Sequence, residues 1–189
     1  NGWHATSTLG TIAAAAAVSR VLGLSQEETG HALSIAGTQA AGVRGVFGSE
    51  VKAFHAGRAA SAGVISAKLA QAGLETPEGV LDGALGYFQA SGIEPEAAVW
   101  QAWRSDESPA IDRAIFKAHA ACGGGQCLVE AVATVVRDAQ LQPDQIESII
   151  GSVSDLSLSM ANVQTPTSFQ DAQFCLPHLA ALAAYEYPI

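Results

Sequence analysis

The sequence predicts an α+β protein, in which a mainly helical domain at residues 1–110 is followed by a smaller α+β domain at residues 111–189. Three observations predict this fold class. Alanine-rich helical patterns fill much of residues 5–72, and short runs typical of strands occur only after residue 110. Between them, the polar and proline-containing stretch "RSDESPAID" at 104–112 has the composition of a domain boundary.

Three helices are expected in the first domain. Residues 5–22 are rich in alanine and end before Gly23, a residue type that commonly follows a helix. "SQEE" at 25–28 has the spacing of a capping box and should open a second helix. After a glycine-punctuated loop at 42–50, residues 51–72 form a third helix of mostly small residues. Small side chains let helices approach closely, so we expect a compact bundle.

The second domain is expected to mix helices and strands. Runs typical of strands occur at three places: 114–120, 146–153 and 155–161. A helix is expected at 126–139, and a last helical stretch begins near Phe169. Just before this domain, Trp100 and Trp103 are spaced one helical turn apart and should anchor packing.

Composition and charge argue against several classes of protein. The chain is 49% hydrophobic and 14% charged, which fits a globular fold and not a disordered one. Its net charge of -9 argues against partners such as nucleic acid or an anionic membrane, which need basic patches. The longest apolar run, "IAAAAAV" at 12–18, is too short to span a membrane. Three cysteines without a secretory signal indicate reduced thiols and a cytoplasmic protein.

The segment "EVKAFHAGRAASAG" at 50–63 concentrates cationic groups among small residues. Lys52 and His55 are three positions apart, so they lie on the same face of the expected helix. An ammonium and an imidazole on a face lined by small residues can bind a carboxylate and move a proton. The alternative is a solvated helix face, which the spacing alone favours.

"GWHATS" places His4 just before the start of a helix. The positive end of the helix dipole disfavours an imidazolium ion, so a neutral His4 can act as a base or a donor. A histidine that only caps the helix is an equal alternative.

"FKAHAACGGGQC" at 116–127 is a third candidate site. Lys117 and His119 would share one face of the expected strand. The glycines should open a helix whose free amides can hold a carboxylate, although no Lys-Ser/Thr follows them as a Walker motif requires. A weaker alternative is a zinc site made by His119, Cys122, Cys127 and His178.

Three stretches together resemble the MmgE/PrpD family: "GWHATSTLGTIAAAAAVSRVLGLSQEETGHALSIAGTQAAGV", "VKAFHAGRAASAGVISAKLAQAGL" and "FKAHAACGGG". The resemblance continues through "LQPDQIESI" and "DAQFCLPHLAALAA". This family contains 2-methylcitrate dehydratase, cis-aconitate decarboxylase and iminodisuccinate epimerase. The resemblance implies a helical domain, an α+β lid domain and an active site between them without a cofactor. It also implies small di- or tricarboxylate substrates and a homodimer.

The resemblance also implies roles for single residues. The histidine of the family's G-W/F-H motif falls on His4, and the lysine and histidine of its K-P-L-H-x-G motif fall on Lys52 and His55. The lysine that opens the lid segment falls on Lys117. We therefore expect His4, Lys52 and Lys117 to be the acid–base and electrostatic groups. The expected carboxylate-binding residues are Arg44, His55 and His119.

Two features depart from the family pattern. The family often carries a further histidine a little after the lid cysteine, and in this chain that position is Gln126 or is lost among the glycines. Members also have segments before and after the part present here. A start at Asn1 without methionine likewise indicates a piece of a longer protein.

These observations predict a lyase that dehydrates a small hydroxy-tricarboxylate, such as a 2-methylcitrate-like acid, by removing a proton next to a carboxylate. Fixed positive charge would stabilise the anion that develops. Two alternatives stay open: an epimerase of an amino-dicarboxylate and a truncated helical binding module without catalysis. The segment "FKAHAAC" resembles the epimerase branch of the family. The main prediction requires that His4, Lys52 and Lys117 converge on one cavity.

Overall fold

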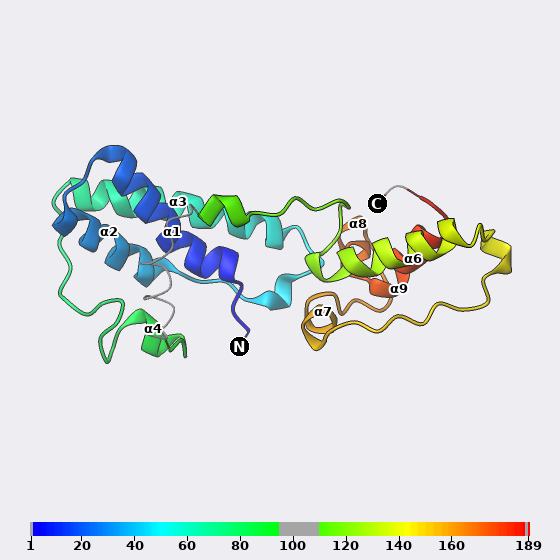
Figure 1. Cartoon of the computed structure of the whole chain (residues 1–189). Helices are drawn as coiled ribbons and strands as arrows, with labels where there is room; N and C mark the ends of the chain where they lie inside the picture. The colour runs from blue at the N-terminus through cyan, green and yellow to red at the C-terminus, as the bar shows by residue number, and fades with distance from the viewer. Residues whose placement is uncertain (1, 95–109, 188) are drawn as a thin grey trace. The chain divides into compact units, whose positions relative to one another are not determined.

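The computed structural model describes residues 2–94, 110–187 and 189, which form helices joined by loops (Figure 1). Two expectations fall outside these residues: the packing role of Trp100 and Trp103, and most of the polar boundary segment that follows them.

Contacts divide the chain into two compact units. The first contains residues 1–46 and 51–109, and the second contains residues 47–50 and 110–189. Each unit has its own clusters of buried hydrophobic residues.

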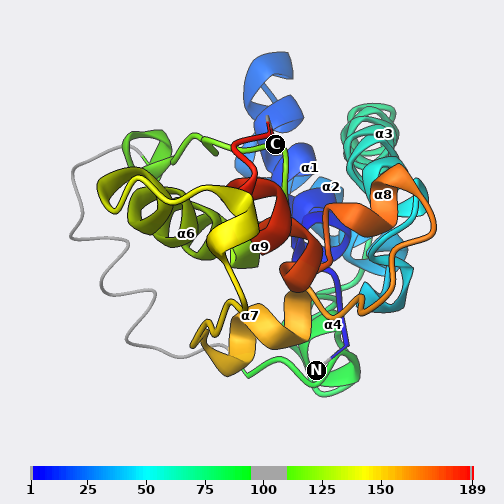
Figure 2. The same cartoon turned by 90° about the vertical axis from the view of Figure 1, so that its right-hand side faces the viewer.

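Three long helices form most of the first unit: α1 (Ala5–Leu22), α2 (Gln26–Gln39) and α3 (Val51–Gln71). All three pairs of these helices are in contact, and they lie side by side in Figures 1 and 2. The helices predicted from periodicity and capping are thereby confirmed. Two short elements accompany them, the 3-10 helix η1 (Arg44–Val46) and the single turn α4 (Tyr87–Ala90).

The first turns of α2 and α1 are capped differently. At α2 the predicted capping box is confirmed, because Glu28 N donates to Ser25 Oγ at 3.2 Å and Ser25 N donates to the Glu28 carboxylate at 2.7 Å. The bonds from Ser25 lower the pKa of Glu28. At α1 the N-cap residue is His4, whose side chain makes no capping hydrogen bond. The imidazole of His4 is therefore available for other contacts.

Small side chains allow α1 and α3 to pack closely, as the sequence predicted. A Cβ atom added at Gly63 of α3 would lie only 2.6 Å from the backbone nitrogen of Ala15 in α1. The buried positions of α1 are small or polar: Ser7, Thr8, Thr11, Ala15 and Ser19. A cluster of α2 and α3 residues completes the packing: Ala32, Ile35, Ala67 and Ala70.

Helix α1 is long and apolar enough, by length and composition alone, to cross a membrane, which the sequence analysis did not expect. The core helix of a soluble protein can meet the same criteria. In this structure α1 packs against α2 and α3.

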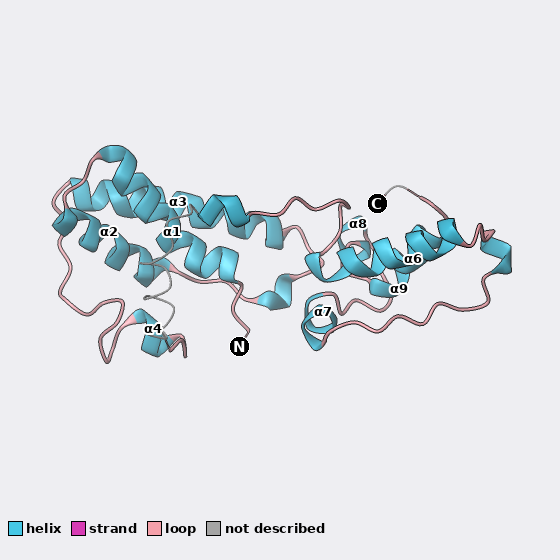
Figure 3. Ribbon diagram, in the orientation of Figure 1, coloured by secondary structure: helices cyan, strands magenta, loops and turns pink. Residues whose placement is uncertain are grey.

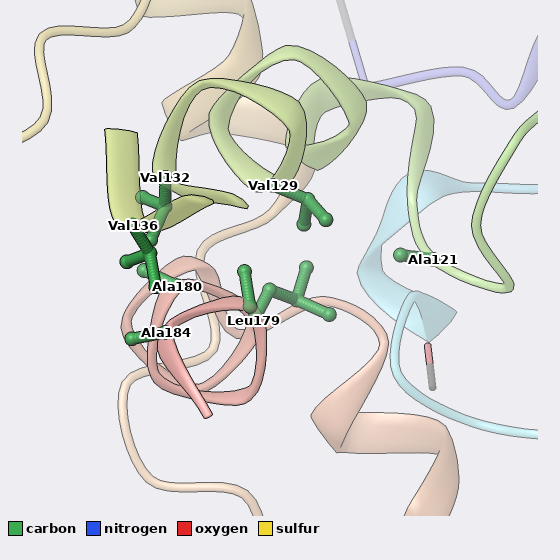
Figure 4. Packing of buried hydrophobic residues seen from close by; sticks show 8 residues of the cluster. Ala121, Val129, Val132, Val136, Leu179, Ala180 and Ala184 are labelled. Atoms are coloured by element: carbon green, nitrogen blue, oxygen red, sulfur yellow. The ribbon is translucent and has the colours of Figure 1, made fainter. Parts of the chain in front are cut away.

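The core of the second unit lies between α6 (Gln126–Asp138) and α9 (Leu176–Ala184). Figure 4 shows three valines of α6 pointing toward α9: Val129, Val132 and Val136. They are spaced i, i+3 and i+7, so they lie on one face of the helix. Leu179 of α9 faces them and is only 2% exposed. The helix predicted at 126–139 is confirmed.

Short helical elements complete the second unit. They are η2 (Ala110–Arg113), η3 (Gly123–Gly125), η4 (Pro143–Gln145), α7 (Asp155–Met160) and α8 (Phe169–Ala172). The last helical stretch begins at Phe169, as predicted, but it is interrupted before α9.

The strand predicted at 155–161 is wrong, because these residues form the helix α7. The Ser154 hydroxyl accepts a hydrogen bond from Ser157 N at 3.1 Å and caps the helix. Leu156 and Leu158 are 63% and 51% exposed, so their alternation with serine does not reflect one buried face of a sheet. A run of six residues makes less than two helical turns, so its hydrophobic pattern is too short to distinguish a strand from a helix.

The strands predicted at 114–120 and 146–153 are also not found, and Figure 3 shows loops at both places. A strand needs a neighbour for its backbone N–H and C=O groups. Among the described residues the only β-type pairings are two isolated bridges, Trp3 with Val43 and Asn162 with Cys175. The prediction of an α+β lid domain is therefore not confirmed, whereas the helical first domain agrees with the structure.

Candidate functional site

The backbone just before α1 is paired with the loop after α2. His4 N donates to Gly42 O at 3.0 Å, and Arg44 N donates to Gly2 O at 2.8 Å. Between these bonds, Trp3 and Val43 form an antiparallel bridge. This pairing fixes His4 at the start of α1 and brings Arg44 to the same end of the helix.

His4 also meets His55, which lies on α3 and is 51 positions later in the sequence. Their Nδ1 atoms are 2.9 Å apart, and their ring centroids are 5.2 Å apart. Each histidine is only 8% exposed. A hydrogen bond between two ring nitrogens needs one N–H donor and one bare nitrogen, so the two rings cannot both carry a proton at Nδ1.

Burial lowers the pKa of His4 from its ordinary value of 6.5, and the charges of His55, Lys52 and Arg44 lower this pKa further. His4 is therefore neutral at pH 7. Sequence reasoning expected a neutral His4 because of the helix dipole. The structure gives burial and neighbouring cations as the causes instead.

The lowered pKa of His4 predicts a stability that depends on pH. Below pH 6.5 the unfolded ring binds a proton more readily than the folded ring, so protonation favours unfolding. The free energy of unfolding should fall as the pH drops from 6.5 through the folded-state pKa of His4 and then level off. Denaturant titrations over this range should detect the fall, and the His4→Asn variant should lack this component.

If the wild type and the His4→Asn variant had the same pH dependence of stability, the lowered pKa of His4 would be contradicted. His55 contacts His4, so the difference between the two curves reports His4 together with its effect on His55.

Gly42 makes the histidine contact possible. Its φ angle is 122°, a conformation that side chains with a Cβ atom rarely adopt. An added Cβ would lie 2.5 Å from Ser7 Oγ and 3.1 Å from His55 Cε1. The space next to the two histidines is therefore closed to any larger residue.

Gly42→Ala is expected to destabilise the first unit by about 1–3 kcal/mol, because the backbone is strained and the Ser7 and His55 side chains must move. Thermal or denaturant unfolding measures this loss. Gly45→Ala is the matched control in the same loop, because an added Cβ there meets no atom within 4 Å. A loss as large in Gly45→Ala would show that the loop tolerates no substitution and that the contacts of Gly42 are not special.

The structure thus brings four predicted site residues together in the first unit: His4, Arg44, Lys52 and His55. The helical spacing that placed Lys52 and His55 on one face agrees with this cluster. The cationic side chains of Lys52 and Arg44 are half-buried beside the histidine pair.

The other two predicted residues lie in the second unit. Lys117 Nζ donates to Ala121 O at 3.3 Å. His119 Nε2 lies 2.7 Å from the Glu130 carboxylate of α6. His119 therefore already has a carboxylate partner within its own unit. Whether Lys117 and His119 join the cluster of the first unit stays a prediction.

Sequence reasoning missed the roles of Gln126 and Glu130. Gln126 accepts from His119 N at 3.1 Å and donates to the carbonyl oxygens of His119 and Ala121 at 3.0 and 3.3 Å. Gln126 thus braces the loop carrying His119. Both residues are polar and lie in the first two turns of α6, next to the preceding loop. Polar residues at the start of a helix can bond to the loop before it, and this pattern could have indicated their roles.

The glycine run 123–125 serves packing in this structure. Added Cβ atoms would lie 3.0 Å from the Ser157 backbone at Gly124 and 2.8 Å from the Leu179 side chain at Gly125. These glycines therefore allow close contacts with α7 and α9, and the expected carboxylate cradle stays a prediction. The zinc alternative also lacks support, since no three His, Cys, Asp or Glu residues gather in metal-binding geometry within the described parts of the chain. All three cysteines are free thiols.

A separate hollow of about 800 Å³ lies beside α2 in the first unit. His31 lines it, and its Nδ1 accepts a hydrogen bond from Thr76 N at 3.1 Å. None of His4, Arg44, Lys52 or His55 lines this hollow. The chemistry of the histidine pair, and not the size of a hollow, therefore identifies the candidate site.

Comparison with known protein families also divides the chain into two parts. Residues 1–99 match the MmgE/PrpD N-terminal domain, and residues 119–187 match the MmgE/PrpD C-terminal domain. The chain belongs to the MmgE/PrpD family. All four clustered residues lie in the part that matches the N-terminal domain of the family, and Lys117 lies just before the second match.

Several curated proteins are similar to this chain. A cis-aconitate decarboxylase of Aspergillus terreus is 39% identical over 89 residues, which are 47% of this chain and 18% of the relative. A cis-aconitate decarboxylase-like protein of Aspergillus oryzae is 31% identical over 163 residues, covering 78% of this chain and 33% of the relative. The cis-aconitate decarboxylase of Homo sapiens is 39% identical over 80 residues, which are 42% of this chain. The matches span a third or less of these relatives' own length.

Proposed function

We propose that this MmgE/PrpD protein is a lyase that removes water from a small hydroxy-tricarboxylate, without a cofactor, by abstracting a proton next to a carboxylate. The observation that carries the proposal is the buried contact between His4 and His55 beside Lys52 and Arg44. Neutral imidazoles are suited to proton transfer near pH 7, and fixed cations are suited to carboxylates.

The proposed chemistry divides between these groups. Lys52 and Arg44 bind substrate carboxylates and stabilise the enolate-like anion that forms when the adjacent C–H bond breaks. The electron pair of that bond becomes the new C=C bond, and the hydroxyl group leaves as water after it receives a proton. Dehydration thus needs both a base and an acid, and a neutral histidine pair can supply one of each.

Lys117 and His119 are proposed to complete the site from the second unit. Lys117 would add positive charge near the substrate, and His119 would bind a further carboxylate after exchanging its Glu130 contact for the ligand. A homodimer, which the family resemblance implies, is part of the same proposal. So is a cytoplasmic location, which rests on three cysteines without a secretory signal.

Decarboxylation is the second candidate, and the names of the similar proteins favour it. In that reaction the C–C bond to a carboxylate breaks, carbon dioxide leaves, and the remaining carbanion takes one proton. A decarboxylase needs a proton donor but no base for a C–H bond, so the histidine pair argues for dehydration and the relatives argue for decarboxylation.

One set of assays separates these reactions. The protein is incubated with a panel of hydroxy-tricarboxylates and unsaturated tricarboxylates. Ultraviolet-absorbing alkene product from the former indicates dehydration, and carbon dioxide from the latter indicates decarboxylation. Exchange of an α proton with solvent deuterium from an amino-dicarboxylate, without an alkene product, would indicate an epimerase. Binding of these acids without any turnover would indicate a non-catalytic helical module and contradict the proposal.

Lys52→Ala is expected to lower kcat/KM for the active acid by about 10²- to 10³-fold, because a fixed charge that stabilises the developing anion is lost. Steady-state kinetics on the folded variant measure this effect. Lys68→Ala is the matched control, since Lys68 is exposed in the last turn of the same helix. Unchanged kinetics in Lys52→Ala would remove Lys52 from the site.

A further inference from the structure

The contact between His4 and His55 fixes how protons are arranged on the pair. In the neutral pair, the ring that donates at Nδ1 carries its only proton there, so its Nε2 atom is bare. The ring that accepts at Nδ1 must carry its proton at Nε2. The pair therefore has one basic nitrogen and one N–H donor at its two Nε2 atoms, whichever ring donates at Nδ1.

The geometry of the contact excludes two protonated rings. Two imidazolium rings would place an N–H on each Nδ1, and the 2.9 Å contact would lose its acceptor. Arg44 and Lys52 disfavour further positive charge at His4. Each histidine is only 8% exposed, so water competes little for the contact.

We propose that His4 and His55 form a proton relay, in which one ring takes a proton from the substrate carbon and the other delivers a proton to the leaving group. This inference rests on the proposed lyase function and adds a role for His55, which the sequence analysis had assigned to carboxylate binding. His55 acts in the proton transfer itself and touches the reacting groups through Nε2.

The relay balances without any further reactant. The bare Nε2 of the first ring takes the proton from carbon, and the first ring passes its Nδ1 proton to Nδ1 of the second ring. The second ring gives its Nε2 proton to the departing hydroxyl, which leaves as water. The pair is neutral before and after, with both tautomers exchanged, and proton exchange with water at the two Nε2 atoms resets it.

Nitrogen NMR of the purified protein labelled with ¹⁵N-histidine tests the arrangement without substrate. The expected result is one ring protonated at Nδ1 and the other at Nε2, with a single added proton shifting the resonances of both rings. His4→Asn and His55→Asn assign the signals. Two rings with the same tautomer, or two rings that titrate independently, would overturn the relay even if the protein proves to be a lyase.

Kinetics of His55→Asn test the proton transfer. Asparagine can keep a hydrogen bond to His4 Nδ1, but it cannot pass a proton onward. A relay predicts a kcat lower by about 10²- to 10⁴-fold with little change in KM. A raised KM with an unchanged kcat would instead identify His55 as a carboxylate-binding residue, and near wild-type kinetics would identify it as a residue that only orients His4.

Different results would contradict the lyase function and the relay. Complementary tautomers in a protein that turns over no acid would overturn the lyase function, and with it the relay. Turnover with retained activity in His55→Asn would overturn the relay and leave the lyase function intact.

Discussion

Replacing Gly63 by alanine is expected to destabilise the first unit by about 3 kcal/mol, although alanine is the better helix former. The added Cβ would lie 2.6 Å from Ala15 N and 2.8 Å from Ala14 C in the facing helix. These are backbone atoms of α1, so relief requires that the two helices move apart. Because His4 is at the start of α1 and His55 is on α3, such a movement would also disturb the histidine contact.

Gly57→Ala provides the matched control in the same helix. An added Cβ at Gly57 meets no atom within 4 Å, so the variant gains helix propensity without a clash. It should be more stable than the wild type by about 0.5–1 kcal/mol. Denaturant unfolding therefore compares the same substitution at two positions of one helix, where the expected changes in the free energy of unfolding have opposite signs. If Gly63→Ala were also stabilising, the close packing of α1 on α3 would be contradicted.

The sequence predicted the first unit well because its signals are local. The capping box at Ser25 and the long alanine-rich runs act within a few turns of one helix, and each appears where it was expected. The small residues also predicted that helices pack closely. The close packing of α3 on α1 would not be possible with a residue larger than glycine at position 63.

The second unit was predicted less well because a strand depends on partners. The extended composition at 146–153 says nothing about whether another strand lies beside it, and the described residues supply none. At 155–160 the local cap from Ser154 outweighs the alternation of leucine and serine. The helix α6 was predicted because its valines repeat with a helical period, whatever their partners are.

The candidate site was partly predictable for the same reasons. The spacing of Lys52 and His55 put both on one helix face. The position of His4 before a helix and the family resemblance both indicated His4, and Arg44 was proposed as a carboxylate-binding residue. Nothing in the sequence indicated that His4 and His55 touch, because the contact depends on how α1 packs against α3 and on the space left at Gly42. For Lys117 and His119 the sequence supplied residue types but not their partners, and Glu130 was not foreseen.

His4→Asn is expected to lower kcat by about 10²- to 10⁴-fold, because asparagine can replace the Nδ1 hydrogen bond but cannot accept a proton from carbon. The pH dependence of the rate should change as well. Burial and the neighbouring cations lower the pKa of His4 below 6.5, so the wild-type rate should decrease only at pH values below this ordinary value. The residual activity of the variant should lack that decrease.

His31→Gln separates this effect from a general loss of structure. His31 is held by Thr76 N in the first unit and lies among residues that line the hollow beside α2, away from the histidine pair. Its replacement should lower stability by about 1 kcal/mol through the lost hydrogen bond while kcat stays unchanged. If both variants lost the same activity, the loss would follow from disturbed packing. If only His4→Asn lost activity, and if its rate also lacked the decrease at low pH, the proton transfer would be placed at His4.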